Sequence, residues 1–195
     1  MSNLIVESLQ EAQLGLTALL ENAVALSSIE QAACLLVKTL KESGQVFSCG
    51  NGGSMCDAMH FAEELSGRYR LDRRALAASS ISDVAHISCV GNDYGYEYIF
   101  SRYLEGHAKA GDCLLAISTS GASQNVIKAA RYAKENGVNV IALCGKEGSP
   151  LERVSDVTIC TPAGSYADRV QELHIKVIHI LIEQVERELF PENYL

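Results

Sequence analysis

The chain has 195 residues, of which 48% are hydrophobic and 21% charged, with 15 glycines and 3 prolines. This length suits one domain with a sizeable core, and the composition excludes disordered and collagen-like chains. The net charge of -8 argues against a general binder of nucleic-acid backbones, although it leaves room for a local basic pocket that holds a small anion.

Neither an export signal nor a membrane span is expected. The first residues, MSNLIVESLQEAQ, lack the basic start of a signal peptide, and no uncharged apolar run approaches the roughly 18–20 residues that a span needs. The seven cysteines form no C-x-x-C pair, which argues against a disulfide framework and an all-cysteine zinc site. We therefore expect a cytoplasmic protein, without a nucleic-acid or membrane partner, that uses its cysteines as small core residues.

The first 43 residues predict two helices, at about 4–26 and 28–43, because apolar residues recur there at helical spacing. Gly44 is suited to end the second helix. Neither helix carries residues of obvious chemistry, so we expect this pair to serve packing or oligomerisation.

From residue 45 onward, short apolar runs alternate with helical segments. The predicted strands are 46–49, 76–81, 113–117, 138–143 and 157–160, and the predicted helices are 55–67, 96–109, 123–136 and 168–189. Asp168 and Gln171 have the spacing of a capping box at the start of the last helix. The alternation predicts an α/β fold, a doubly wound parallel five-stranded sheet flanked by helices. We expect a single domain over 1–195, in which the helical pair 1–43 precedes an α/β core at 45–195.

Two loops follow predicted strands at the edge where ligands of such sheets bind. The first, Gly50 to Ser54, contains Asn51, Gly52 and Gly53 and leads into a helix, but Met55 replaces the third glycine of a dinucleotide fingerprint. It suits a small anionic or sugar ligand, or equally a plain tight turn. The second loop carries four hydroxyls, which predict a phosphate cradle rather than a simple helix cap by Ser120 or Ser123: Ser118, Thr119, Ser120 and Ser123.

Carboxylates and imidazoles occur on two of the predicted helices. His60 and Glu64 share a helix face at i, i+4, which suits metal ligation, an acid–base pair or an ordinary hydrogen-bonded pair. The last helix carries Gln171 and His179, which lie about 12 Å apart along an ideal helix. One ion could bind both only in an irregular helix or with help from a second subunit. Metal binding therefore stays open at this point.

These residues fall in segments that resemble the phosphoheptose isomerase family of sugar isomerase (SIS) domain enzymes. The segments are SCGNGGSMCDAMHFAEELSGRYR (48–70), VGNDYG (90–95), AISTSGASQNVIKA (116–129) and YADRVQELHIKVIHILIE (166–183). Enzymes of this family interconvert sedoheptulose 7-phosphate and D-glycero-D-manno-heptose 7-phosphate, the heptose precursor of bacterial lipopolysaccharide. The resemblance implies a homotetramer with its active sites between subunits.

The resemblance also implies a role for each matching residue. Glu64 is the implied base and His179 its acid–base partner. Zinc, one ion per subunit, is implied at His60, Glu64, Gln171 and His179. The implied substrate-binding residues, apart from Glu64, are Asn51, Gly52, Gly53, Ser54, Arg68, Asn92, Asp93, Ser118, Thr119, Ser120, Ser123, Asp168 and Gln171. From the residues alone, Asn92 and Asp93 fit sugar hydroxyls and a plain turn equally well.

Two alternatives share the predicted fold. One is a non-catalytic SIS-domain tetramer that binds a replication initiator protein; it would have no use for the full acid–base set. The other is an isomerase of a six-carbon sugar phosphate, which shares the chemistry and differs in pocket length.

Overall fold

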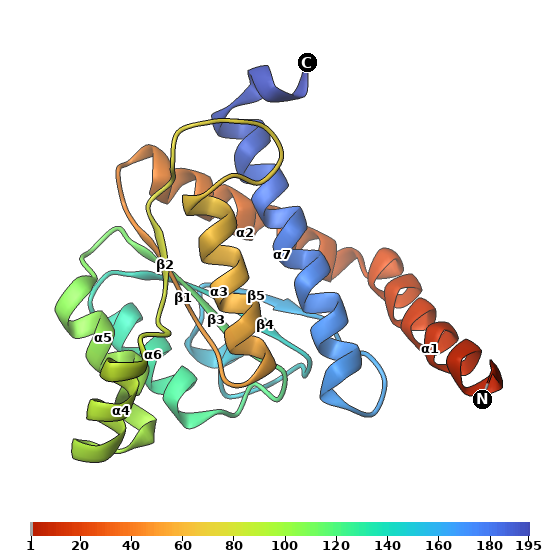
Figure 1. The fold of residues 1–195 in the computed structure, drawn as a ribbon, viewed down its shortest axis with the longest axis horizontal. Helices are drawn as coiled ribbons and strands as arrows, with labels where there is room; N and C mark the ends of the chain where they lie inside the picture. The colour runs from red at the N-terminus through yellow and green to blue at the C-terminus, as the bar shows by residue number, and fades with distance from the viewer. Residues whose placement is uncertain (1) are drawn as a thin grey trace.

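The computed structural model describes residues 2–195 and shows one parallel sheet between two layers of helices (Figure 1). The strands run in the order β2-β1-β3-β4-β5, and every neighbouring pair is parallel. Their bounds are Val46–Cys49 for β1, Ala78–Ser80 for β2, Cys113–Ser118 for β3, Asn139–Cys144 for β4 and Val157–Cys160 for β5. The predicted doubly wound five-stranded sheet is confirmed.

The sheet separates two hydrophobic cores. Alternate residues of the central strands face opposite sides, as Leu115 and Leu114 of β3 do. One face is covered by α2 (Ala23–Lys41), α3 (Gly53–Ser66) and α7 (Ala167–Leu189), and the other by α5 (Ile99–His107) and α6 (Gln124–Glu135). Because β1 and β3 are neighbours whose connections lead to opposite faces, the loops that follow them open at the same edge of the sheet.

The expected N-terminal helical pair is present as α1 (Ser2–Glu21) and α2. The break between them lies at Asn22, whose side-chain oxygen accepts a hydrogen bond from the backbone N–H of Ala25 and caps α2. The helix α2 is long and apolar enough to cross a membrane by length and composition alone, but nearly half of it is buried. It packs against α7 and β5, so its apolar face belongs to the core.

Several sequence predictions differ from the structure. The region before residue 96 contains an unpredicted helix, α4 (Val84–Asp93), capped by the Asp83 carboxylate, which accepts from His86 N at 2.6 Å. The predicted capping box is wrong, because Tyr166 is the N-cap of α7 and the Asp168 carboxylate accepts from the N–H of Arg169 instead. The expectation that all cysteines are core residues is wrong for three exposed ones, Cys34, Cys56 and Cys89.

Candidate active site

The glycine loop between β1 and α3 holds the start of α3 close to α7. Gly52 caps α3 with a φ of 55°, a conformation that favours glycine. A side chain on Gly53 would begin 2.6 Å from Nε2 of Gln171, so the Gln171 amide would have to move to make room for it. Ser54 is buried at this helix start, where its backbone N–H donates to the Asn51 carbonyl. The loop therefore presents the positive end of α3 beside the Gln171 amide.

The hydroxyl loop between β3 and α6 leaves its hydroxyls available to a ligand. Ser123 occupies the N-cap position of α6, yet its side chain makes no capping hydrogen bond. Its Oγ instead accepts from Ser118 Oγ at 3.1 Å, while Ser120 Oγ accepts from the N–H of Ala122 at 3.2 Å. The alternative of a simple cap thus accounts for one hydroxyl at most, and the start of α6 remains open to an anion.

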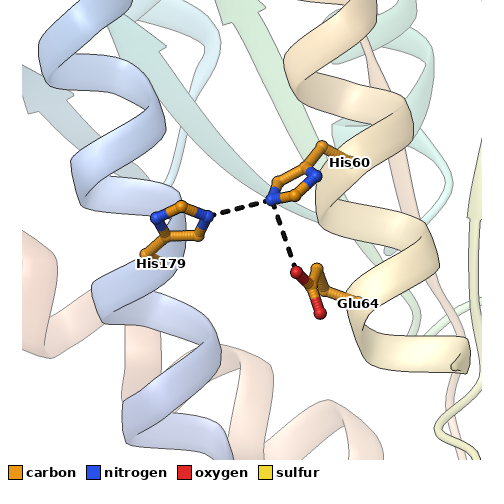
Figure 2. Close-up of side chains that lie close together, drawn as sticks. All are labelled: His60, Glu64 and His179. Carbon is orange, nitrogen blue, oxygen red and sulfur yellow. Dashed lines mark hydrogen bonds and ion pairs between the residues drawn. The ribbon is translucent and has the colours of Figure 1, made fainter. Parts of the chain in front are cut away.

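Two histidines and a carboxylate meet where α3 packs against α7 (Figure 2). Nε2 of His60 lies 2.9 Å from Nε2 of His179 and 3.5 Å from Oε1 of Glu64. On its other side the His60 ring contacts a second carboxylate, with Nδ1 3.2 Å from Oε1 of Glu63. This contact gives Nδ1 a hydrogen-bond acceptor, while Nε2 faces His179 and Glu64.

The surroundings of this group shift the protonation of its members in useful directions. Burial raises the pKa of Glu64, and the neighbouring Glu63 carboxylate raises it further against the opposing effect of His60. Burial lowers the pKa of His179, and the His60 ring beside it adds to that effect. One turn before His60, burial raises the pKa of Asp57 to about 6. The shifts of Glu64 and His179 make the first a stronger base and the second a stronger acid than the free side chains.

The donor set of this group fits a zinc ion. The three donor atoms of His60, Glu64 and His179 lie within 4.8 Å of one another. Bonds of about 2.0–2.1 Å in a tetrahedral site place ligand atoms roughly 3.3 Å apart, and the separations of 2.9 and 3.5 Å from His60 Nε2 bracket that value. Three protein ligands leave one position for a substrate or water.

A buried ion pair fixes the end of α3 on which Glu64 stands. Arg73 donates from Nε to the Glu186 carboxylate at 2.8 Å and from a terminal nitrogen to the backbone carbonyl of Glu64 at 2.6 Å. The side chains of Arg73 and Glu186 are 1% and 0% exposed. The second oxygen of Glu186 accepts from the Tyr194 hydroxyl at 3.0 Å. The backbone position of Glu64 is thereby tied to α7.

The structure brings some predicted residues together and leaves others apart. Gln171 lies against Gly53, seven residues or about 10 Å along α3 from His60. The expected set of four metal ligands is therefore not gathered within one chain. Four further predicted substrate contacts are exposed, and within residues 2–195 they make no hydrogen bond or ion pair to His60, Glu64 or His179: Arg68, Asn92, Asp93 and Asp168.

Sequence reasoning missed several residues of the site region. Arg73 lies in a segment without periodicity, so nothing in the sequence indicates its burial. Asn125 lies two residues beyond the hydroxyl loop, and Tyr96 begins a short 3-10 helix (Tyr96–Tyr98) where a longer helix was predicted. Both bond to Asn51. A search for polar residues in the turns next to each loop would have found these two.

Comparison with known proteins identifies the family. The sequence model of the SIS domain matches residues 11–145. Phosphoheptose isomerases from Tolumonas auensis and Proteus mirabilis are both 54% identical to this chain, over 95% and 96% of its length and 97% of theirs. The chain belongs to the phosphoheptose isomerase family. The predicted family is thus confirmed, and these relatives do not support the alternative of a non-catalytic tetramer.

Solved structures of the family share the architecture. The phosphoheptose isomerase of Francisella tularensis has a TM-score of 0.88 at 32% identity, covering 96% of this chain and 99% of its own. That of Neisseria gonorrhoeae has a TM-score of 0.81 at 35% identity, covering 95% of this chain and 96% of its own. The parallel sheet and the helices around it are therefore the fold of this enzyme family.

Proposed function

We propose that this protein is an aldose–ketose isomerase that converts sedoheptulose 7-phosphate to D-glycero-D-manno-heptose 7-phosphate. The observation that carries the proposal is the meeting of Glu64 with His60 and His179, in a chain 54% identical to phosphoheptose isomerases over almost its full length. In bacteria that make lipopolysaccharide, this reaction supplies its heptose precursor, and we place the reaction in the cytoplasm.

The reaction moves one proton between two neighbouring carbons of the open-chain sugar. We assign Glu64 as the base that takes the proton from C1 of the ketose, while His179 gives a proton to the oxygen on C2. The resulting enediol returns its O1 proton to His179, and Glu64 delivers its proton to C2 to give the aldose. The raised pKa of Glu64 and the lowered pKa of His179 support these roles, since the first shift makes Glu64 a stronger base and the second makes His179 a stronger acid.

The two loops would hold the substrate across this group. The Ser123 hydroxyl, which does not cap α6, and the open start of that helix support phosphate binding by the hydroxyl loop, with Ser118, Thr119 and Ser120 beside it. Asn51, Gly52 and Gly53 would line the sugar, with Ser54 near the phosphate. Gripping a remote phosphate fixes the reacting carbons in place, which contributes to the rate in addition to proton transfer.

We propose a zinc ion at His60, Glu64 and His179, with Gln171 as a further ligand donated by a second subunit. When bound, the ion would hold these four side chains in place, and zinc sites that expand to five ligands can also polarise a substrate carbonyl. The carboxylate of Glu63 at the other ring nitrogen of His60 supports this site, because zinc-binding histidines commonly donate their second N–H to such a partner.

We propose a homotetramer in which the single domain 1–195 uses residues 1–43 for assembly. The first half of α1 projects from the body of the protein, and its Leu4, Ile5 and Leu9 are 63–69% exposed (Figure 1). A groove of about 740 Å³ between α2 and α7 has an apolar floor that includes Ile29 and Val37. A second copy's α1 would cover this groove. Such an assembly would also let Arg68, Asn92, Asp93 and Asp168 reach a neighbour's site.

NMR of sedoheptulose 7-phosphate incubated with the protein tests this function. We expect an aldose 7-phosphate from the wild type and a loss of about 10²–10⁴-fold in rate for Glu64→Gln, which keeps the shape and removes the base. A chelator arm, with zinc restored afterwards, measures the need for metal. A folded wild type that binds the sugar phosphate and never converts it would contradict the proposal.

A further inference from the structure

A network of side-chain amides joins the glycine loop to the hydroxyl loop. Nδ2 of Asn51 donates to Oδ1 of Asn125 at 2.9 Å, and Nδ2 of Asn125 donates back to Oδ1 of Asn51 at 2.8 Å. The Tyr96 hydroxyl reaches the same Asn51 oxygen at 3.0 Å. Asn125 is only 3% exposed, in the first turn of α6, whereas Asn51 is half-buried. The network therefore connects the glycine loop to the protein interior.

A backbone N–H fixes the direction of every bond in this network. The N–H of Val126 donates to Oδ1 of Asn125 at 3.0 Å. A backbone N–H can only donate, so the amide atom of Asn125 that lies next to Val126 N must be the oxygen. The other amide atom of Asn125, which contacts Asn51 at 2.8 Å, must then be the nitrogen. The Asn51 oxygen then faces Asn125, and the Tyr96 hydroxyl must donate to it. The start of α6 thus determines the orientation of the Asn51 amide.

This orientation limits what Asn51 can offer a ligand. An amide oxygen accepts two hydrogen bonds and an amide nitrogen donates two. Both acceptor positions of Asn51 are filled, by Asn125 and Tyr96, and one N–H is used by Asn125. One N–H remains. A cavity of about 340 Å³ borders the network and is also lined by Ser123 of the hydroxyl loop, so a ligand held by that loop can reach Asn51.

We propose that Asn125 and the Tyr96 hydroxyl are positioning residues that make Asn51 a pure hydrogen-bond donor to the sugar chain of the substrate. The inference rests on the proposed function for the identity of the sugar phosphate. The group that Asn51 meets is an acceptor, a hydroxyl or carbonyl oxygen. A substrate analogue with an ammonium group at that position, which can only donate, would be rejected.

Equilibrium binding to the intact protein separates this role from general damage to the site. Dissociation constants for sedoheptulose 7-phosphate and for inorganic phosphate are measured by calorimetry for the wild type, Asn125→Ala and Tyr96→Phe. The matched control is Asn136→Ala, at the other end of α6, where the side chain bonds only to the exposed helix end. Thermal unfolding and kcat are measured for each protein.

We expect Asn125→Ala to weaken sedoheptulose 7-phosphate binding about tenfold or more, as the loss of a buried hydrogen-bond partner does. Tyr96→Phe should weaken it less, since Asn125 still orients Asn51. Phosphate binding should change less than twofold in both variants, and kcat should fall less than the affinity for the sugar phosphate. Asn136→Ala should leave all constants unchanged.

Two results would overturn the proposal. One is an unchanged dissociation constant for sedoheptulose 7-phosphate in both variants. The other is an equal loss of affinity for sedoheptulose 7-phosphate and for inorganic phosphate, which indicates damage to the hydroxyl loop. Tyr96 is 56% exposed, so Tyr96→Phe remains informative even where Asn125→Ala fails to fold. Failure of the proposed function has a separate signature, namely a wild type that binds the sugar phosphate with no turnover.

Discussion

Replacing Arg73 by Met tests the buried ion pair that anchors the end of α3. Arg73 gives its Nε–H to Glu186 and further hydrogen bonds to the backbone carbonyls of Gly67 at 2.7 Å and Glu64 at 2.6 Å. Methionine fills a similar volume but leaves the Glu186 carboxylate buried, with the Tyr194 hydroxyl as its one remaining hydrogen-bond partner within residues 2–195. Removing one member of a buried pair typically costs about 3–5 kcal/mol, so we expect the free energy of unfolding to fall by about that amount.

Urea unfolding measures the loss, and two further variants show its origin. Arg102 pairs with Glu105 at a similar distance on the surface, where both side chains are more than one third exposed. Arg102→Met should therefore cost less than about 1 kcal/mol. The double variant Arg73→Met with Glu186→Met should recover most of the loss, since apolar residues can replace a buried pair at little cost.

A second consequence concerns the reaction, because the Arg73 guanidinium holds the backbone of Glu64. We expect Arg73→Met to lower kcat more than it weakens phosphate binding, when both are measured without urea and at a temperature where the variant is fully folded. Two results would refute the reasoning that burial makes this pair strong. One is a loss in the free energy of unfolding for Arg73→Met as small as that for Arg102→Met, and the other is a loss for the double variant as large as that for Arg73→Met alone.

Two further predictions concern a buried histidine and the hydroxyl loop. His174 is fully buried, and burial lowers its pKa to about 4 from 6.5. The unfolded chain therefore binds a proton that the folded chain does not, and stability should fall by up to about 3 kcal/mol as pH drops from 6.5 toward 4. Urea unfolding at both pH values should show this component in the wild type and not in His174→Leu; identical pH dependence would contradict it. Ser123→Ala should weaken inorganic phosphate binding about tenfold with no change in melting temperature, because its hydroxyl does not cap α6; a loss of helix stability instead would favour the capping role.

The sequence predicted the sheet well because its central strands are continuous apolar runs, as in Cys113–Ser118. It failed where local signals competed. Gly91, Asn92 and Asp93 look like a turn, yet they form the end of α4, whose start is marked by Asp83 directly before an apolar run. Such a residue before an apolar run is typical of a helix start, so Asp83 predicts α4. At Asp168 the sequence predicted a cap that the structure does not have, because α7 begins one residue earlier, at Ala167.

Without the family resemblance, the residues alone predict the site only as far as local spacing reaches. His60 and Glu64 are four residues apart on one helix, so their proximity follows from helix geometry. Their contact with His179, 119 positions along the chain from His60, depends on how α3 packs against α7. No periodicity in the sequence encodes that packing. The Arg73 ion pair and the Asn51–Asn125 amides depend on tertiary contacts in the same way.

The packing of α3 on α7 also explains why one chain gathers three of the four expected metal ligands. The two helices touch at Gly53 with Gln171 and again at His60 with His179. The two contacts are seven residues apart on α3 and eight residues apart on α7, which corresponds to a rise of about 10 and 12 Å. The helices therefore run side by side in the same direction through two turns. The alignment that joins His60 to His179 keeps Gln171 at the far end of the contact, beside the glycine loop. In a straight α7, Gln171 thus lies at the glycine loop of its own chain and about 12 Å along the helix from His179. One metal ion bound by both side chains would therefore need the Gln171 of a neighbouring subunit.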